Sequence, residues 1–267
     1  MKKTLFLFVA MVMITTVSQA QEDFSKFRMG FKMSPNISWM QPQDKHFINE
    51  GSVARFGFGF VADIFFAQNY AVGTGVNIMR QGGQLSYLEE DRLDDVDYII
   101  RRNRTYSNQY VEIPLTFKLR TNEIGYITYW GQFGFGLGVN INSRGDDTKE
   151  YLLSQVFDTT SGDLIGWSGD VLPDPKASTE ENTNFTDDIQ LFRMSLLMGA
   201  GIEYNLSGST SILVGINYNN GFTNVMAKEN VIKTSDNEPV FDPGFNPETV
   251  KLRAISNSLE LNVGILF

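Results

Sequence analysis

Histidine and cysteine, two residue types that often serve in catalysis and as metal ligands, are nearly absent from the chain. His46 is the only histidine, there is no cysteine, and no serine motif accompanies the histidine. The sequence therefore supports neither a Ser-His-Asp site nor a thiolate metal site. Asp94, Asp95 and Asp97 carry the oxygen ligands that calcium prefers, but the glycine and the terminal glutamate of a known calcium loop are missing, which favours a solvated acidic loop. We predict no catalytic residues, no metal and no cofactor, and we expect that the protein is not an enzyme.

A second group of chemically active residues consists of charged side chains placed between apolar or small neighbours. Glu112, for example, stands between Val111 and Ile113. If such residues face a confined interior, each must be paired with an opposite charge. We favour an internal salt-bridge plug, with a narrow proton or ion path as the alternative, and no single pair can be assigned from the sequence. The predicted interior charge network is Arg28, Lys32, Arg55, Asp63, Glu112, Lys118, Arg120, Arg193, Glu203 and Glu260.

The charged residues would be positioned by β-strands, in which side chains alternate between two faces with a period of two residues. Between Ile127 and Asn142 the odd positions are apolar apart from Gly131, whereas the even positions are small or polar apart from Trp130. Side chains alternate across a β-strand, so this pattern gives one apolar face and one polar face. The same alternation recurs in residues 27–39, 55–66, 70–78, 110–120, 192–205, 211–218 and 255–267.

Eight such segments predict an all-β fold, a transmembrane antiparallel up-and-down β-barrel. A soluble sandwich would also alternate, but the polar face here is rich in glycine, which weakens a strand in water and suits the crowded interior of a narrow barrel. Residues 151–157 and 164–167 could form a further hairpin across residues 158–163. We interpret this hairpin as an extension outside the membrane, with a ten-stranded barrel as the alternative.

The connections between the strands alternate strictly between short and long. Three are tight, residues 67–69, 121–123 and 207–209. Four are long and polar, residues 41–52, 84–105, 143–188 and 226–250. Transmembrane barrels have short periplasmic turns and long extracellular loops. We therefore expect mobile loops outside the cell and both termini in the periplasm.

The N-terminus has the features of a secretory signal peptide. Lys2 and Lys3 precede an apolar run from Leu5 to Val17, and Ser18-Gln19-Ala20 is a small-x-small cleavage sequence. We predict a cleaved signal peptide at residues 1–20 and an outer-membrane β-barrel domain at residues 21–267. Without Lys2 and Lys3, 20 basic residues remain against 31 acidic ones, and the formal net charge of −11 argues against nucleic-acid binding.

The chain ends in an alternating apolar pattern. Phe267 is the last residue, and the positions two, four, six and eight before it are also apolar. This pattern looks like the terminal-strand signal that is recognised by the barrel-insertion machinery of the outer membrane. The predicted insertion signal is Leu259, Leu261, Val263, Ile265 and Phe267.

Three short motifs resemble those of a known family. The segment Tyr110 to Lys118, Tyr-Val-Glu-Ile-Pro-Leu-Thr-Phe-Lys, is similar to the Y-x-E-I-P-L-x-x-K strand of the PorT-like outer-membrane β-barrel proteins. The Gly134-x-Gly136-x-Gly138 strand and the opening Gly30-Phe31-Lys32 resemble the same family. The resemblance covers almost the whole chain after residue 20, apart from the long loops. It implies a membrane barrel and, because PorT itself is tied to type IX protein secretion, an accessory role in an envelope or secretion machine.

These features together predict a structural or binding role, in which the barrel anchors and displays extracellular loops in the cell outer membrane. The alternatives are a narrow transport or secretion-assisting barrel and, third, an outer-membrane enzyme. The expected partners are outer-membrane lipid and lipopolysaccharide, the barrel-insertion machinery and other envelope proteins. Arg101, Arg102 and Arg104 lie near the outer rim of the fourth strand, where they could contact lipopolysaccharide phosphates or form simple rim charge.

Overall fold

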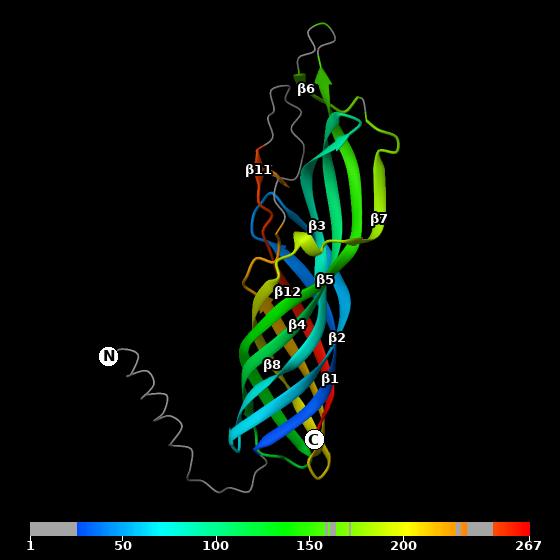
Figure 1. The fold of residues 1–267 in the computed structure, drawn as a ribbon. Coiled ribbons are helices and arrows are strands. Elements are labelled where there is room, and N and C mark those ends of the chain that lie inside the picture. Colours follow the sequence, from blue (N-terminus) through cyan, green and yellow to red (C-terminus); the bar gives the residue numbers. More distant parts are fainter. Residues whose placement is uncertain (1–25, 158–159, 161–163, 171, 228–230, 234–247) are drawn as a thin grey trace, which may run out of the picture.

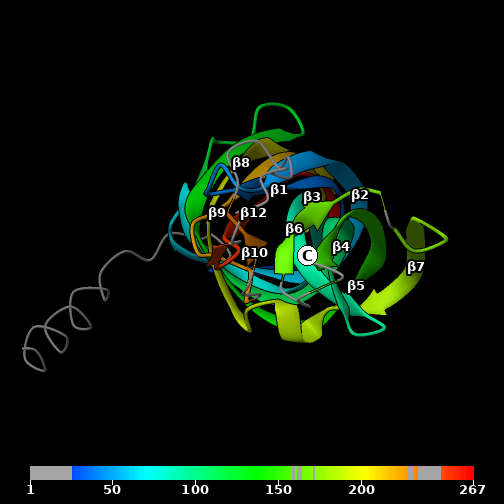
Figure 2. The ribbon, with the colours of Figure 1, turned by 90° about the horizontal axis from the view of Figure 1, so that it is seen from above.

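The computed structural model describes residues 26–157, 160, 164–170, 172–227, 231–233 and 248–267, so the predicted signal peptide lies outside the described residues. Within them, eight long antiparallel strands close into a barrel, since β1 pairs with β2 on one side and with β12 on the other (Figures 1 and 2). The ring consists, in order, of β1 (Phe27–Pro42), β2 (Ile48–Ala67), β3 (Tyr70–Leu93), β4 (Val96–Arg120), β5 (Ile127–Phe157), β8 (Phe192–Ser207), β9 (Thr210–Gly221) and β12 (Ala254–Leu266). No helix in the described part of the chain is long and apolar enough to cross a membrane.

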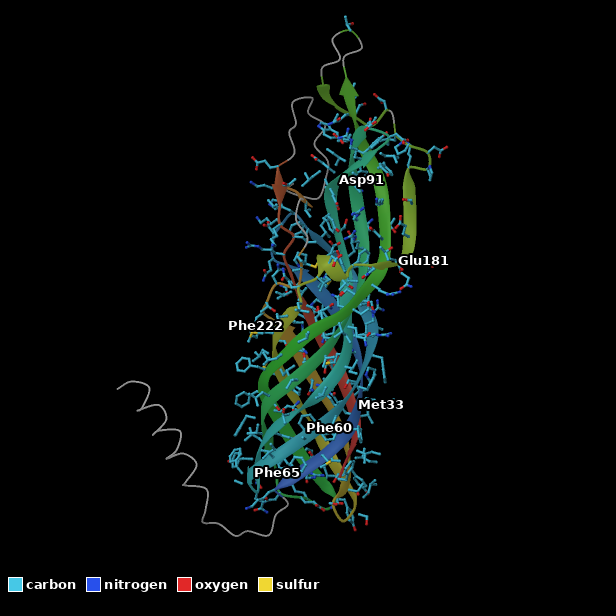
Figure 3. The ribbon with its side chains drawn as sticks, in the orientation of Figure 1. Met33, Phe60, Phe65, Asp91, Glu181 and Phe222 are labelled. Carbon is cyan, nitrogen blue, oxygen red and sulfur yellow. The ribbon has the colours of Figure 1, made fainter. Side chains whose placement is uncertain are left out.

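The two faces of each strand differ as the alternation predicts. Ile113 and Leu115 on β4 are 51% and 58% exposed, whereas Glu112 on the same strand is buried. Exposed apolar side chains such as Met33 and Phe222 continue around the outside of the ring and form what we call the apolar belt (Figure 3). The barrel therefore presents its apolar faces outward, as a transmembrane barrel does towards lipid.

Aromatic rings mark the lower edge of this belt, close to the tight turns. Phe66, Tyr70 and Phe117 stack on one another with ring centroids 6.0–6.2 Å apart. Girdles of aromatic residues lie at both membrane interfaces of transmembrane barrels. The stack therefore places one membrane interface at the end of the barrel that carries the short turns.

Glycine on the inward face makes room for large interior side chains. A Cβ on Gly136 would lie 2.8 Å from Ser195 Oγ and 2.9 Å from the Glu112 carboxylate. A Cβ on Gly215 would collide with the Trp130 ring. These two glycines are thus explained by close packing inside the barrel rather than by flexibility.

Two of the connections predicted to be long loops consist largely of strands instead. Residues 84–105 continue the hairpin of β3 and β4, which stay paired as far as Leu93 and Val96. Asp94 and Asp95 form its two-residue turn with φ of 49° and 62°, as a turn with two left-handed residues requires. Likewise β5 is 31 residues long and includes residues 143–157. The loop prediction is wrong here because polar residues mask the alternation, while pairing with a long neighbouring strand stabilises these segments.

The projecting strands form a second part of the molecule, which we call the head (Figure 1). It consists of the ends of β3, β4 and β5 beyond the ring, with β6 (Leu164–Ser168), β7 (Ala177–Asn184), the 3-10 turn η1 (Thr186–Asp188), β10 (Val231–Ile232) and β11 (Thr249–Val250). The end of β5 pairs with β6, which confirms the hairpin predicted across residues 158–163. Among the described strands β6 pairs only with β5, so it lies outside the ring and the barrel has eight strands rather than ten.

The head has hydrophobic clusters of its own. A cluster at its base contains Met40, Phe47, Leu85, Tyr87, Tyr106, Phe185, Ile189, Val225, Met226, Val231, Leu252 and Ala254. A second cluster contains Leu88, Ile99, Leu153, Trp167 and Ile232. Because these side chains come from all four long connections or their borders, the connections pack together. The expectation of four separate loops is therefore replaced by one folded unit.

Candidate functional site

Five predicted interior residues meet near the tight-turn end of the barrel, and we call them the Glu203 cluster: Arg28, Asp63, Lys118, Arg120 and Glu203. Lys118 Nζ lies 2.6 Å from Asp63 Oδ2 and 2.9 Å from Glu203 Oε1. The other oxygen of Glu203 lies 2.7 Å from Arg28 Nη1 and 3.0 Å from Arg120 Nη2. Three cations therefore converge on one carboxylate, and the side chains of Asp63, Lys118 and Glu203 are at most 2% exposed.

A second group lies further along the interior, towards the head, and we call it the Glu112 cluster. Arg193 Nη1 donates to Glu112 Oε2 at 3.1 Å, and Arg193 Nη2 donates to Asn219 Oδ1 at 2.7 Å. The Asn219 amide nitrogen lies 3.3 Å from Glu112 and 3.4 Å from Glu260, so it donates between two carboxylates. These four residues come from β8, β4, β9 and β12, and all are buried. The cluster therefore ties together strands from different sides of the ring.

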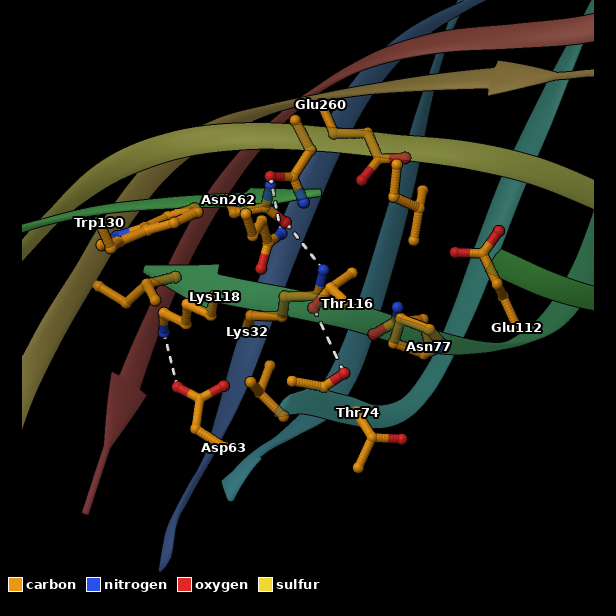
Figure 4. A pocket seen from close by; sticks show the side chains of 17 residues that line it. Lys32, Asp63, Thr74, Asn77, Glu112, Thr116, Lys118, Trp130, Glu260 and Asn262 are labelled. Atoms are coloured by element: carbon orange, nitrogen blue, oxygen red, sulfur yellow. Dashed lines mark hydrogen bonds and ion pairs between the residues drawn. The ribbon is translucent and has the colours of Figure 1, made fainter. Parts of the chain in front are cut away.

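A small cavity lies between the two clusters (Figure 4). Its volume is about 40 Å³, and its lining includes Asp63 and Lys118 from one cluster and Glu112 and Glu260 from the other. A space of this size has room for only a few water molecules. The described interior is thus filled by side chains, as expected for a barrel of eight strands.

Two predicted network residues lie outside the clusters. Lys32 lines the same cavity and donates from Nζ to Asn262 Oδ1 at 3.0 Å. Arg55 is placed at the barrel wall instead, where its Nη1 donates to the backbone oxygen of Ala54 at 3.1 Å and its side chain lines an outer groove. The structure therefore brings nine of the ten predicted residues into the barrel interior and turns Arg55 outward.

The neutral side chains that complete the network were not predicted. They include Ser211, which accepts from Arg28 at 3.0 Å, and Gln81, which donates to Ser258 at 2.9 Å. Ser258 in turn donates to Glu260 at 3.1 Å. A signal was present in the sequence, because Ser211 and Ser258 occupy positions on the polar face of their strands. They were missed because the prediction included only the charged residues of that face.

Arginines that were considered for lipopolysaccharide contact are largely buried in the head. Arg102 Nη1 lies 3.0 Å from Glu89, and Arg104 Nη2 lies 3.1 Å from Asp147. Arg101, by contrast, is a quarter exposed and lies 3.4 Å from Glu150. Arg102 and Arg104 therefore stabilise the head from within, and the structure contradicts their placement at an accessible rim.

Two tyrosines share this buried region. Tyr87 and Tyr106 are completely buried. Burial raises the pKa of both hydroxyls, because an ionised phenolate would lose its hydration. Both side chains are therefore neutral at physiological pH and pack as part of the core of the head.

The acidic residues that were weighed as calcium ligands belong to the tip of the β3–β4 hairpin. Asp94 and Asp95 form the turn, and Asp97 lies 3.8 Å from Arg92. His46 lies 3.3 Å from Asp44 at the border of the head. Among the described residues, no group of three or more His, Asp or Glu side chains is arranged to hold a metal ion.

The predicted insertion signal lies at the seam of the barrel. Its five residues lie on β12 and at the chain end, and they are 43–52% exposed on the outer face. The strand pairs with β1 in the register Phe31↔Ile265, which closes the ring. Recognition of this strand by the insertion machinery stays a prediction.

Comparison with known families identifies the class of protein. The family described as outer membrane protein beta-barrel domain matches residues 18–227. The match covers well over half of the chain, and the chain belongs to this family of outer-membrane β-barrel proteins. A search of curated protein sequences gives no significant match.

Several solved outer-membrane proteins are similar to the chain at low identity. The attachment invasion locus protein Ail of Yersinia pestis is 12% identical, with 91% of this chain and 100% of Ail covered and a TM-score of 0.32. Neisserial surface protein A is 10% identical, with 91% and 96% covered and a TM-score of 0.36. OprG of Pseudomonas aeruginosa is 12% identical, with 90% and 94% covered and a TM-score of 0.36.

Proposed function

We propose that the protein is a closed membrane anchor that carries a folded, β-structured head on the outer surface of the cell and acts there by binding. The observation that carries the proposal is the contrast between the two parts of the molecule. The barrel interior is filled by the two charge clusters around a cavity of about 40 Å³. The head, in contrast, extends well beyond the apolar belt and has its own buried clusters.

The proposed orientation follows from the lengths of the connections. Barrels of this class keep short turns in the periplasm and large structures outside the cell. We infer that residues 121–123 and 207–209 face the periplasm together with both termini, and that the head faces outward. A signal peptide at residues 1–20 is the route of export in this proposal.

The kind of partner is inferred from the exposed surface of the head. The side chains of β7 are mostly exposed and include Glu180 and Glu181. Figure 3 shows Glu181 on the flank of the head. Because charged side chains are costly to move out of water, an acidic strand of this kind is unsuited to insertion into lipid, and we infer that its partner is another envelope protein. Membership in the PorT-like group, and with it an accessory role in an envelope or secretion machine, rests on the Tyr110–Lys118 motif. Its glutamate, Glu112, is the partner of Arg193.

A conductance measurement tests the closed barrel. We expect the purified protein in a planar bilayer to pass no steady current above that of the lipid alone, because the two charge clusters fill the described interior around a cavity of only about 40 Å³. A general porin in the same bilayer is the positive control. Stable, voltage-independent current steps that scale with the amount of inserted protein would contradict the proposal and favour the narrow-transport alternative.

A further inference from the structure

The wall of the barrel opens locally between β2 and β3, on the side of the head. Pairing of these strands extends to Gly57↔Met79 and resumes only at Gly51↔Gln84. Residues 52–56 therefore have no partner in β3, although they remain paired with β1 on their other side. An unpaired stretch in the wall of a closed barrel exposes backbone groups that need other partners.

The pairing between β2 and β3 is interrupted because β3 turns inward near Arg80 and Gly82. Asn36 Nδ2 on β1 donates to the backbone oxygen of Arg80 at 3.2 Å, and Ser38 Oγ accepts from the backbone nitrogen of Gly82 at 2.8 Å. Side chains of β1 thus bind the backbone of β3, which is two strands away in the ring. The displacement of β3 leaves space on the outer side, next to the free edge of β2.

This space is a groove on the outer surface with a volume of about 570 Å³. It is lined by Ala54, Arg55, Phe56, Phe58, Ile78, Arg80 and Gln109. Phe56 and Phe58 belong to the apolar belt and are 44% and 52% exposed. The two arginines lie one step further towards the head on β2 and β3. The groove therefore crosses the upper boundary of the apolar belt, with an apolar part and a cationic part.

The positive charge of the cationic part is only weakly balanced by acidic side chains of the protein. Arg80 is exposed and forms no ion pair with any residue that the structure describes. Arg55 donates to the free edge of β2 through the Ala54 oxygen, and its Nε is buried without a hydrogen-bond partner. Asp146 acts on Arg55 electrostatically, but the two side chains form no ion pair within the described residues. Two positive charges are thus held side by side and directed at the membrane boundary.

We propose that this groove binds a phosphorylated lipid of the outer leaflet, with a phosphate between Arg55 and Arg80 and an acyl chain along Phe56 and Phe58. Guanidinium groups bind phosphate oxygens through paired, charge-assisted hydrogen bonds. The apolar part of the groove matches a chain that enters from the membrane. In the outer leaflet this chemistry is that of lipopolysaccharide, whose lipid moiety carries phosphate on an acylated sugar. The choice of leaflet rests on the proposed orientation of the head.

Binding of defined lipids to the purified full-length protein in detergent tests the site. The probes are bis-phosphorylated lipid A, the same lipid without phosphate, and inorganic phosphate alone, with bound lipid measured by native mass spectrometry. We expect the parent chain to retain lipid A, and Arg80→Gln to weaken retention roughly tenfold, the order expected for a lost charge-assisted contact. Arg55→Gln should act in the same direction. Arg92→Gln, which removes an exposed arginine on the distant hairpin tip, is the matched control and should bind as the parent does.

Three results would overturn the site: equal retention by the parent and Arg80→Gln, equal retention of lipid with and without phosphate, or displacement by inorganic phosphate at the concentration of lipid A. The first two would show that the arginines do not hold the headgroup, and the third would show an anion site without a lipid component. Because detergent micelles have no sides, an inverted orientation would leave these results unchanged. Failure of the lipid site and failure of the proposed orientation are therefore distinguishable.

Discussion

Replacing Glu203 by alanine is expected to destabilise the barrel by about 3–5 kcal/mol, the cost of leaving buried charges uncompensated. Glu203 contacts Arg28, Lys118 and Arg120 at 2.7–3.0 Å and is almost fully buried. Without it, Asp63 alone would face three cations. The measurement is the urea midpoint of the protein folded in lipid vesicles. Glu180→Ala on the exposed strand β7 is the control and should change the midpoint little.

A second substitution separates charge from packing. Arg120 has Glu203 as its ion-pair partner among the described residues, and its side chain is 18% exposed. Adding Arg120→Gln to Glu203→Ala restores the original excess of one positive charge, so the double variant should be more stable than Glu203→Ala alone. If Glu203→Ala unfolds at the parent midpoint, the cluster does not work by charge compensation. The same conclusion follows if the losses of stability caused by Glu203→Ala and by Arg120→Gln simply add in the double variant.

Leu137→Lys is expected to destabilise the folded protein by roughly 2–4 kcal/mol in a bilayer, because a lysine near the membrane midplane loses its hydration. Leu137 lies on the outer face of β5, 49% exposed, between Ile113 on β4 and Met194 on β8. Ser209→Lys, in the exposed turn between β8 and β9, is the control and should unfold like the parent. The midpoint of unfolding in vesicles is the readout.

The loss of stability caused by Leu137→Lys should depend on whether lipid or detergent surrounds the barrel. In detergent, where water and polar groups reach the side chain more easily, the loss should be smaller than in a bilayer. Equal stability of Leu137→Lys and the parent in bilayers would mean that the odd-numbered face of β5 does not meet lipid.

Much of the barrel could be predicted because a strand in its wall meets two different environments. The outer face contacts lipid and the inner face contacts packed polar groups, so apolar and polar residues alternate strictly along the strand. Glu112 and Ile113, adjacent in the sequence, are 1% and 51% exposed. The same rule placed Glu203 and Lys118 inside. It could not pair them, since partners such as Arg28 and Glu203 are 175 residues apart and meet only when the ring closes.

The head was not predictable in the same way because its strands do not meet lipid. Arg102 and Arg104 are buried there through ion pairs, so their charge suggested exposure that the structure does not have. The position of Arg55 was missed for a different reason. The prediction of faces from alternating residues holds only where neighbouring strands stay paired. At Arg55 the register shift between β2 and β3 interrupts the pairing, and the side chain turns out through the wall.

Labelling of single cysteines tests most directly that a membrane-spanning barrel holds the head outside the cell. The chain has no native cysteine, so each introduced thiol reports one position. Ser178→Cys lies on the exposed strand β7 of the head, and Ser209→Cys lies in a tight turn at the opposite end of the barrel. With a membrane-impermeant maleimide, we predict that Ser178→Cys is labelled on intact cells and that Ser209→Cys is labelled only after the outer membrane is opened. Labelling of Ser209→Cys on intact cells, with Ser178→Cys protected until the membrane is opened, would contradict the account.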